Sequence, residues 1–141
     1  TMPSSAPWLL FPDAMMAGVI LAVQLLVYPA FLHFSPENLL RWHTTYTHRI
    51  SLLVVPLMLA QLLGGVHWAY LHPGWGSGVY LGLVVLLWGI TFLKFVPYHK
   101  AISRGQADKT LLRRLVAENW IRTLLWIVAL IWHLAVWTRK P

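Results

Sequence analysis

The chain has 141 residues, of which 58% are hydrophobic and only 11% are charged, and it carries a formal net charge of +7 with no cysteine. A soluble domain of this length has more surface than so few charged side chains can cover. The lack of cysteine excludes disulfides, thiolate metal ligands and cysteine nucleophiles. Most cations lie in short segments beside apolar stretches, where they meet anionic lipid headgroups. We therefore expect a lipid bilayer as the partner, and no nucleic acid.

The spacing of the charges predicts four membrane spans. Residues 50–93 form a run of 44 residues without Asp, Glu, Lys or Arg, and residues 14–34 are equally free of charge. A helix needs about 20 apolar residues to cross the hydrocarbon core of a bilayer, so the longer run holds two spans. The sequence predicts an all-α fold, an integral membrane four-helix bundle that forms a single domain over residues 1–141. The spans are expected at about 12–33, 49–70, 78–98 and 119–137.

The connections differ in length and in kind. After the first span, Ser35-Pro36-Glu37 is typical of a helix start, so a short interfacial helix is expected from Ser35 to about Thr45. Residues 72–77 are mostly helix breakers, which makes the second and third spans an antiparallel hairpin. Residues 110–118 read as helix that either lies on the membrane or extends the fourth span.

Small residues spaced four apart predict where helices touch, because they let two backbones approach closely. On this basis we expect contacts through Ala14, Gly18 and Ala22 in the first span, and through Gly78 and Gly82 in the third.

The cations predict the orientation. The first–second and third–fourth connections are rich in Lys and Arg, whereas the opposite side has only Arg139 and Lys140. By the positive-inside bias, both long connections are cytoplasmic and both termini are outside. We expect a multi-pass protein of the bacterial inner (cytoplasmic) membrane. The cations of the long connections are Arg41, Arg49, Lys94, Lys100, Arg104, Lys109, Arg113 and Arg114.

Polar side chains concentrate toward the predicted cytoplasmic end. Pro29, Pro56 and Pro97 each remove a helical hydrogen bond there and are expected to kink three spans. Charges within spans usually face the bundle interior because lipid solvates them poorly. A cationic, donor-rich ligand pocket is the resulting hypothesis. Its candidate residues are Gln24, Tyr28, Tyr46, His48, Arg49, Lys94, His99, Asn119 and Arg122.

Such a pocket suits a phenolate, a quinone carbonyl, a carboxylate or a lipid phosphate. The alternative is that Lys94 and Arg122 extend to headgroups while the prolines only shape the bundle.

Histidines raise the question of a metal. Two pairs lie at similar depths, His67 with His133 and His48 with His99, and paired imidazoles on facing helices can hold haem iron. No other metal is expected, because few carboxylates accompany the histidines. No spacing indicates a Ser/His/Asp triad or a phosphate-binding loop.

Several segments carry a resemblance: residues 24–31, 42–50, 55–59, 96–105 and 119–126. Together they resemble a family of small bacterial four-span membrane proteins. More distantly, Pro97 with its polar neighbours and the Asn119-x-x-Arg122 motif are similar to features of the anthrone oxygenase-like membrane proteins. This resemblance implies oxidation of polycyclic phenols without an obvious metal site. His99 stands where that group is expected to have asparagine.

Two classes of function follow, and the sequence leaves open which is right and whether there is a cofactor. The first is a non-catalytic membrane protein, either an accessory subunit of a larger assembly of membrane protein subunits or a binder of a lipid, a quinone or another hydrophobic aromatic ligand. The second is a small membrane oxidoreductase acting on hydrophobic phenols. In the second, His99 or His48 serves as general base while Arg122 and Asn119 stabilise the oxyanion.

Overall fold

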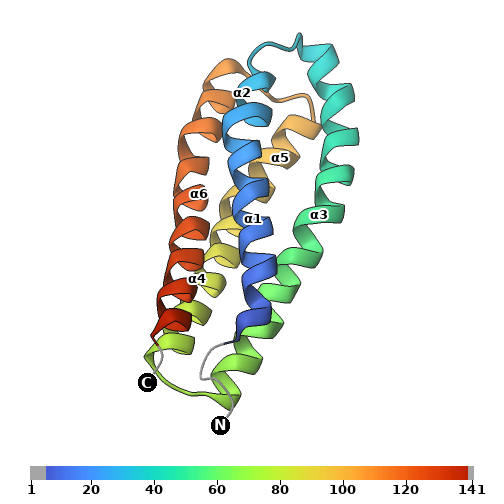
Figure 1. Cartoon of the computed structure of the whole chain (residues 1–141). Helices are drawn as coiled ribbons and strands as arrows, with labels where there is room; N and C mark the ends of the chain where they lie inside the picture. The colour runs from blue at the N-terminus through green and yellow to red at the C-terminus, as the bar shows by residue number, and fades with distance from the viewer. Residues whose placement is uncertain (1–5, 140–141) are drawn as a thin grey trace.

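Four helical rods run the length of the molecule in the computed structural model, which describes residues 6–139 (Figure 1). No strand occurs within these residues, so the all-α four-helix bundle is confirmed. The first rod combines η1 (Pro7–Leu9), α1 (Leu10–Ala22), η2 (Val23–Val27) and α2 (Tyr28–Phe31); the second is α3 (Pro36–Leu71); the third combines α4 (Trp75–Ile90), η3 (Thr91–Phe95) and α5 (Val96–Ser103); the fourth is α6 (Lys109–Thr138).

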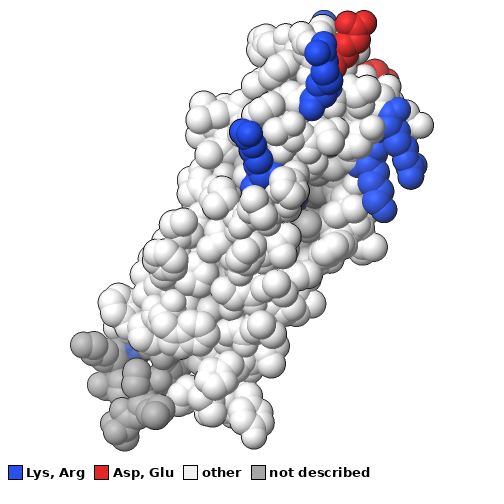
Figure 2. All heavy atoms as spheres, turned by 90° about the vertical axis from the view of Figure 1, so that its right-hand side faces the viewer, with Lys and Arg blue, Asp and Glu red and all other residues white. Residues whose placement is uncertain are grey.

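All four rods are long and apolar enough to cross a membrane, so the protein is a multi-pass membrane protein. The start of η1 and the end of α6 lie at one end of the bundle, beside the α3–α4 turn (Figure 1). The other end, called the charged end below, holds the α2–α3 and α5–α6 connections. Lys and Arg gather there over a hollowed surface, above a long stretch almost free of charge (Figure 2). Lys140 falls outside the described residues.

The helices of the connections form, but each is continuous with a span. Ser35 caps α3, its Oγ accepting a hydrogen bond from the backbone N–H of Asn38 at 3.3 Å, and the helix then runs unbroken for 36 residues. No glycine or proline separates Thr45 from the following span, so nothing stops the helix. Likewise, α6 begins at Lys109, and residues 110–118 extend the fourth span.

Two of the three expected proline kinks take the form of π-turns. Immediately before Pro29, the N–H of Tyr28 bonds to the carbonyl of Val23, and before Pro97 the N–H of Val96 bonds to that of Thr91. Each bond spans five residues instead of four, which adds one residue to the turn. Pro56, by contrast, lies inside the uninterrupted α3.

The prediction of helix contacts was wrong. Ala14, Gly18 and Ala22 are exposed on the outside of the bundle, as are Gly78 and Gly82. The small residues of α3 make the close approaches instead.

At Gly64, an added Cβ would lie 2.4 Å from a methyl carbon of Leu9 and 2.6 Å from the ring of Trp8. At Gly65 it would lie 3.1 Å from the ring of Tyr80. Side chains rather than neighbouring backbones therefore fill the space that these glycines leave: Leu9 and Trp8 at Gly64, and Tyr80 at Gly65.

Candidate functional site

A cavity of about 440 Å³ extends toward the charged end of the bundle, where Lys100 and Ser103 of α5 are part of its lining. One part of its wall is aliphatic, and another carries hydroxyl, imidazole and cationic groups. Such a division matches a ligand with an apolar body and a polar head. The apolar lining is Met16, Val19, Ile20, Val23, Ile50, Val54, Val55, Phe95 and Val96; the polar lining is Tyr28, Tyr46, Thr47, Ser51, Thr91, His99, Lys100, Ser103, Arg104 and Arg122.

Arg122 supplies a buried positive charge to this cavity. It lies on α6, is only 6% exposed, and its guanidinium stacks 4.2 Å above the centre of the Phe95 ring. The phenol groups of Tyr28 and Tyr46 line the same cavity. Its Nε has no hydrogen-bond partner among the described residues. A buried donor without a partner is energetically costly, so a ligand that brings a hydrogen-bond acceptor to Arg122 would be stabilised there.

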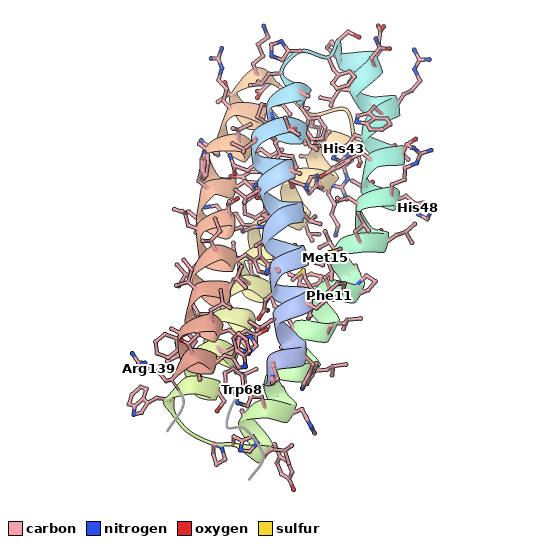
Figure 3. All side chains as sticks on the ribbon, in the orientation of Figure 1. Phe11, Met15, His43, His48, Trp68 and Arg139 are labelled. Carbon is pink, nitrogen blue, oxygen red and sulfur yellow. The ribbon has the colours of Figure 1, made fainter. Side chains whose placement is uncertain are left out.

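Four side chains form a hydrogen-bonded chain along the same end. The Tyr28 hydroxyl lies 2.8 Å from His99 Nε2, and His99 Nδ1 lies 2.8 Å from His43 Nε2. His43 Nδ1 lies 3.0 Å from Ser103 Oγ. His43 is fully buried whereas Ser103 is exposed, so the chain leads from the interior to the surface. The label in Figure 3 places His43 on the inner side of α3.

Gln24 and Asn119 are brought together, but not on the wall of the cavity. The Gln24 carbonyl oxygen accepts bonds from Asn119 Nδ2 at 2.9 Å and from Thr123 Oγ1 at 3.3 Å. Gln24 Nε2 donates to the backbone carbonyl of Val116 at 3.0 Å. These bonds join the first rod to α6, so the pair has a structural role in the bundle.

Three other predicted residues lie away from the cavity. His48 and Arg49 are exposed on α3, and Figure 3 shows His48 directed outward. Lys94 pairs with Glu118 at 3.2 Å, with 43% of the lysine side chain exposed. Glu118 also accepts a hydrogen bond from the hydroxyl of Tyr98.

The structure does not bring the proposed haem pairs together as axial ligands. His67 is exposed, with its ring 6.5 Å from that of Trp8, while His133 is buried and bonded elsewhere. His48 points away from the bundle, and both ring nitrogens of His99 are engaged by neighbours. Among the described residues no group of three or more His, Asp or Glu could hold a metal ion.

A second polar cluster, centred on Asp13, lies toward the other end of the bundle. Asp13 is 1% exposed. Its Oδ1 accepts bonds from Gln61 Nε2 at 2.7 Å and from the Tyr80 hydroxyl at 2.6 Å. Its Oδ2 accepts one from His133 Nδ1 at 2.7 Å. Gln61 Oε1 in turn accepts a bond from Trp126 Nε1 at 3.1 Å. The carboxylate thereby ties α1 to α3, α4 and α6.

Sequence reasoning missed His43, Ser103 and Asp13. His43 falls in the segment that was expected to lie on the membrane surface, yet its three-residue spacing from Tyr46 places the two on one helical face. Asp13 is an acid next to an apolar run, which was a detectable sign of a buried partner. Ser103 is an ordinary hydroxyl with no local sequence signal.

Comparison with known proteins adds no relative: no protein-family model, curated protein or solved structure matches this chain. The chemistry is therefore argued from the geometry. A cationic group, two phenols and an imidazole meet at one end of an aliphatic cavity. Together they can donate hydrogen bonds to a carbonyl, phenolate or carboxylate oxygen.

Proposed function

We propose that the protein binds an amphipathic ligand, with a quinone, phenolate or carboxylate head, in the cavity at its charged end. The observation that carries this proposal is Arg122, a buried cation whose Nε has no partner among the described residues and which lines a cavity that also has aliphatic side chains in its wall. The hydroxyls of Tyr28 and Tyr46 lie beside it and add donors for the same head group. The ligand's apolar body then occupies the space among the aliphatic side chains.

In this proposal the charged end faces the cytoplasm of a bacterium, with both termini outside, as the positive-inside bias favours. The described cations support that orientation, because Arg41, Arg49, Lys100, Arg104 and Lys109 all lie at or near the charged end. A ligand dissolved in the cytoplasmic leaflet would place its head at the height of these cations. Membership of a larger membrane assembly stays a separate prediction.

Ligand titration in lipid nanodiscs tests the proposal. The probes are decylubiquinone, which has carbonyl acceptors, and lauric acid, which has a carboxylate. Binding is read from the quenching of tryptophan fluorescence and from calorimetry. We expect at least one probe to bind saturably to the wild type, and Arg122→Gln to weaken that binding by roughly 10-fold or more, since a hydrogen bond to a charged group contributes about 1.5–3 kcal/mol.

Arg113→Gln is the matched control, because it makes the same change at an exposed position of the same helix. It should leave the affinity unchanged. A second variant, Val54→Phe, narrows the cavity from α3 and should weaken both probes whatever their head group. Equal affinities for wild type, Arg122→Gln and Val54→Phe would refute binding in this cavity.

A second candidate function, oxidation of a hydrophobic phenol, is favoured by one observation: His99 and Arg122 line the same cavity. There His99 Nε2 can accept the phenol proton in place of Tyr28, while Arg122 stabilises the phenolate. Dioxygen is the oxidant in this proposal: a phenol such as 1-naphthol becomes the 1,4-quinone, and the second oxygen atom leaves as water with the two hydrogens removed. Asn119 has no place in this step, because it does not line the cavity. Oxygen uptake with 1-naphthol tests the idea: the wild type should consume oxygen and the His99→Gln/Arg122→Gln double variant should not.

A further inference from the structure

The hydrogen-bonded chain from Tyr28 to Ser103 has a role that ligand binding alone does not explain. We infer that Tyr28, His99, His43 and Ser103 form a proton relay, through which a weakly acidic ligand in the cavity exchanges its proton with water at the charged end. This inference rests on the proposed function, since it needs a ligand in the cavity. It adds the class of ligand, an acid whose protonation state changes while it is bound.

The atoms are arranged so that a proton can pass in either direction. A neutral imidazole has one N–H donor and one acceptor nitrogen. If Tyr28 donates to His99 Nε2, then His99 Nδ1 donates to His43 Nε2 and His43 Nδ1 donates to Ser103. If Ser103 donates, every bond in the chain reverses. The two arrangements differ by one proton shifted along each bond, and both satisfy all four side chains.

A relay event therefore balances without a further reagent. A ligand anion takes the proton of the Tyr28 hydroxyl, Tyr28 regains one from His99 Nε2, and His99 Nδ1 takes one from His43 Nε2. His43 Nδ1 then receives the Ser103 proton, and Ser103 is reprotonated by water. The net change is one proton moved from water to the ligand, which leaves a hydroxide ion at the surface and reverses the three hydrogen bonds of the chain, with no electron transferred.

The positive charges near His43 and His99 make a protonated imidazole unfavourable, so a proton moves through the pair and does not remain on it. Arg122 of α6 acts on His99 across the cavity, and a second positive charge beside it in a poorly solvated site is unfavourable. Tyr46 of α3 and Tyr28 of α2 are the ionisable neighbours within the bundle. Lys100 and Arg104 of α5 line the same cavity. These cations also attract the anionic form of a weak acid.

Burial separates this chain from a simple water path. His43 is fully buried and does not line the cavity, and it joins His99 to Ser103, an exposed residue of α5 that also lines the cavity. A ligand that displaces the water beside Tyr28 leaves this route through His43 to the exposed Ser103 in place. A purely structural link between α3 and α5 would need only one donor and one acceptor. It would not need two imidazoles in series.

The test uses a short-chain alkyl 7-hydroxycoumarin, an acid whose phenol and phenolate forms absorb at different wavelengths. The dye is bound to the full chain in nanodiscs, and its reprotonation is followed by stopped-flow absorbance after a jump in pH. His43→Gln keeps a hydrogen-bond donor and an acceptor at the position, but an amide cannot accept a proton at one atom and release one from another as an imidazole does. We expect this variant to slow reprotonation by about 100-fold, at the low end of what a positioned proton-transfer group contributes, with affinity at constant pH changed less than about twofold.

Ser103→Ala should slow the same step, and its exposed position means that folding is not at risk. Thr44→Ala is the control: it removes another exposed hydroxyl of the charged end and should not slow reprotonation. The reprotonation rate is the decisive measurement, because a purely structural role of these residues would leave that rate unchanged. If the dye binds and wild type, His43→Gln and Ser103→Ala reprotonate at equal rates, the relay is overturned while the binding proposal stands. If the wild type fails to bind this dye and also fails to bind decylubiquinone and lauric acid, both are overturned.

Discussion

Replacing Asp13 tests whether its buried carboxylate holds the bundle together. It accepts hydrogen bonds from Gln61, Tyr80 and His133, which lie on three different helices. Asp13→Ala removes all three bonds and leaves three buried donors. Asp13→Asn keeps the shape and an acceptor for Gln61 and Tyr80, but it loses the negative charge that faces His133. The two variants thus separate the acceptors from the charge.

The magnitude follows from the contacts. Hydrogen bonds between membrane helices contribute about 0.6 kcal/mol on average, with upper values near 1.7 kcal/mol. Three short bonds near the upper value sum to about 5 kcal/mol, and three average ones to about 2 kcal/mol. Leaving a buried donor without a partner costs about 1–3 kcal/mol, so three such donors cost at least about 3 kcal/mol. The two ranges overlap near 3–5 kcal/mol for Asp13→Ala. For Asp13→Asn we expect about 1–2 kcal/mol, since two of the three bonds persist.

Reversible unfolding in mixed detergent micelles, followed by far-UV circular dichroism, measures these differences. Leu63→Ala is the control, because Leu63 is 66% exposed and its loss should cost little. A double-mutant cycle sharpens the test: Tyr80→Phe should cost about 1 kcal/mol in the wild type and close to nothing in the Asp13→Ala background. If Asp13→Ala unfolds like Leu63→Ala, or if the cycle shows no coupling, the carboxylate does not hold the helices and the argument fails.

Three further predictions concern the rest of the bundle and use the same unfolding assay. Gly64→Ala should destabilise the protein by about 1–3 kcal/mol, because its Cβ would collide with Trp8. In the control Gly82→Ala the new Cβ meets no described atom within 4 Å, so this change should stabilise α4 slightly. A larger loss of stability for Gly82→Ala than for Gly64→Ala would contradict the packing. Asp108→Ala should cost about 1 kcal/mol through loss of the cap on α6, with Asp108→Asn as the conservative control. Glu118→Gln should change stability by less than about 1 kcal/mol, because the pair it forms is half exposed; a larger loss would show that this pair is a structural element.

The four spans could be predicted because the cost of burying charge in lipid acts on the sequence directly. Runs without charge, ended by breakers, set the number of helices and the α3–α4 turn. The inner faces were harder. Small residues at Ala14, Gly18 and Gly82 have the spacing of a helix contact but face outward. Which face turns inward depends on distant partners such as Asp13, and a spacing rule within one helix contains no such information.

The candidate site was predicted in part for the same reason. Tyr28, His99 and Arg122 were singled out because they are polar at one depth, and the structure places all three on the cavity wall. His48 shares their depth but lies on the outer face of α3, so depth alone misplaced it. His43 required the knowledge that α3 continues without a break past Thr45, which brings it opposite α5.

The π-turn Val23–Val27 has a consequence for what changes of length the first rod tolerates. It inserts one residue into the turn that links α1 to α2. Deleting one residue there would convert the wide turn into a regular α-turn and leave the inward faces of α1 and α2 nearly in register. Asp13 and Tyr28 would therefore keep their partners. A one-residue deletion at Val23–Val27 should thus be tolerated better than one inside the regular helix α6, which would rotate the residues on one side of it by about 100° relative to those on the other.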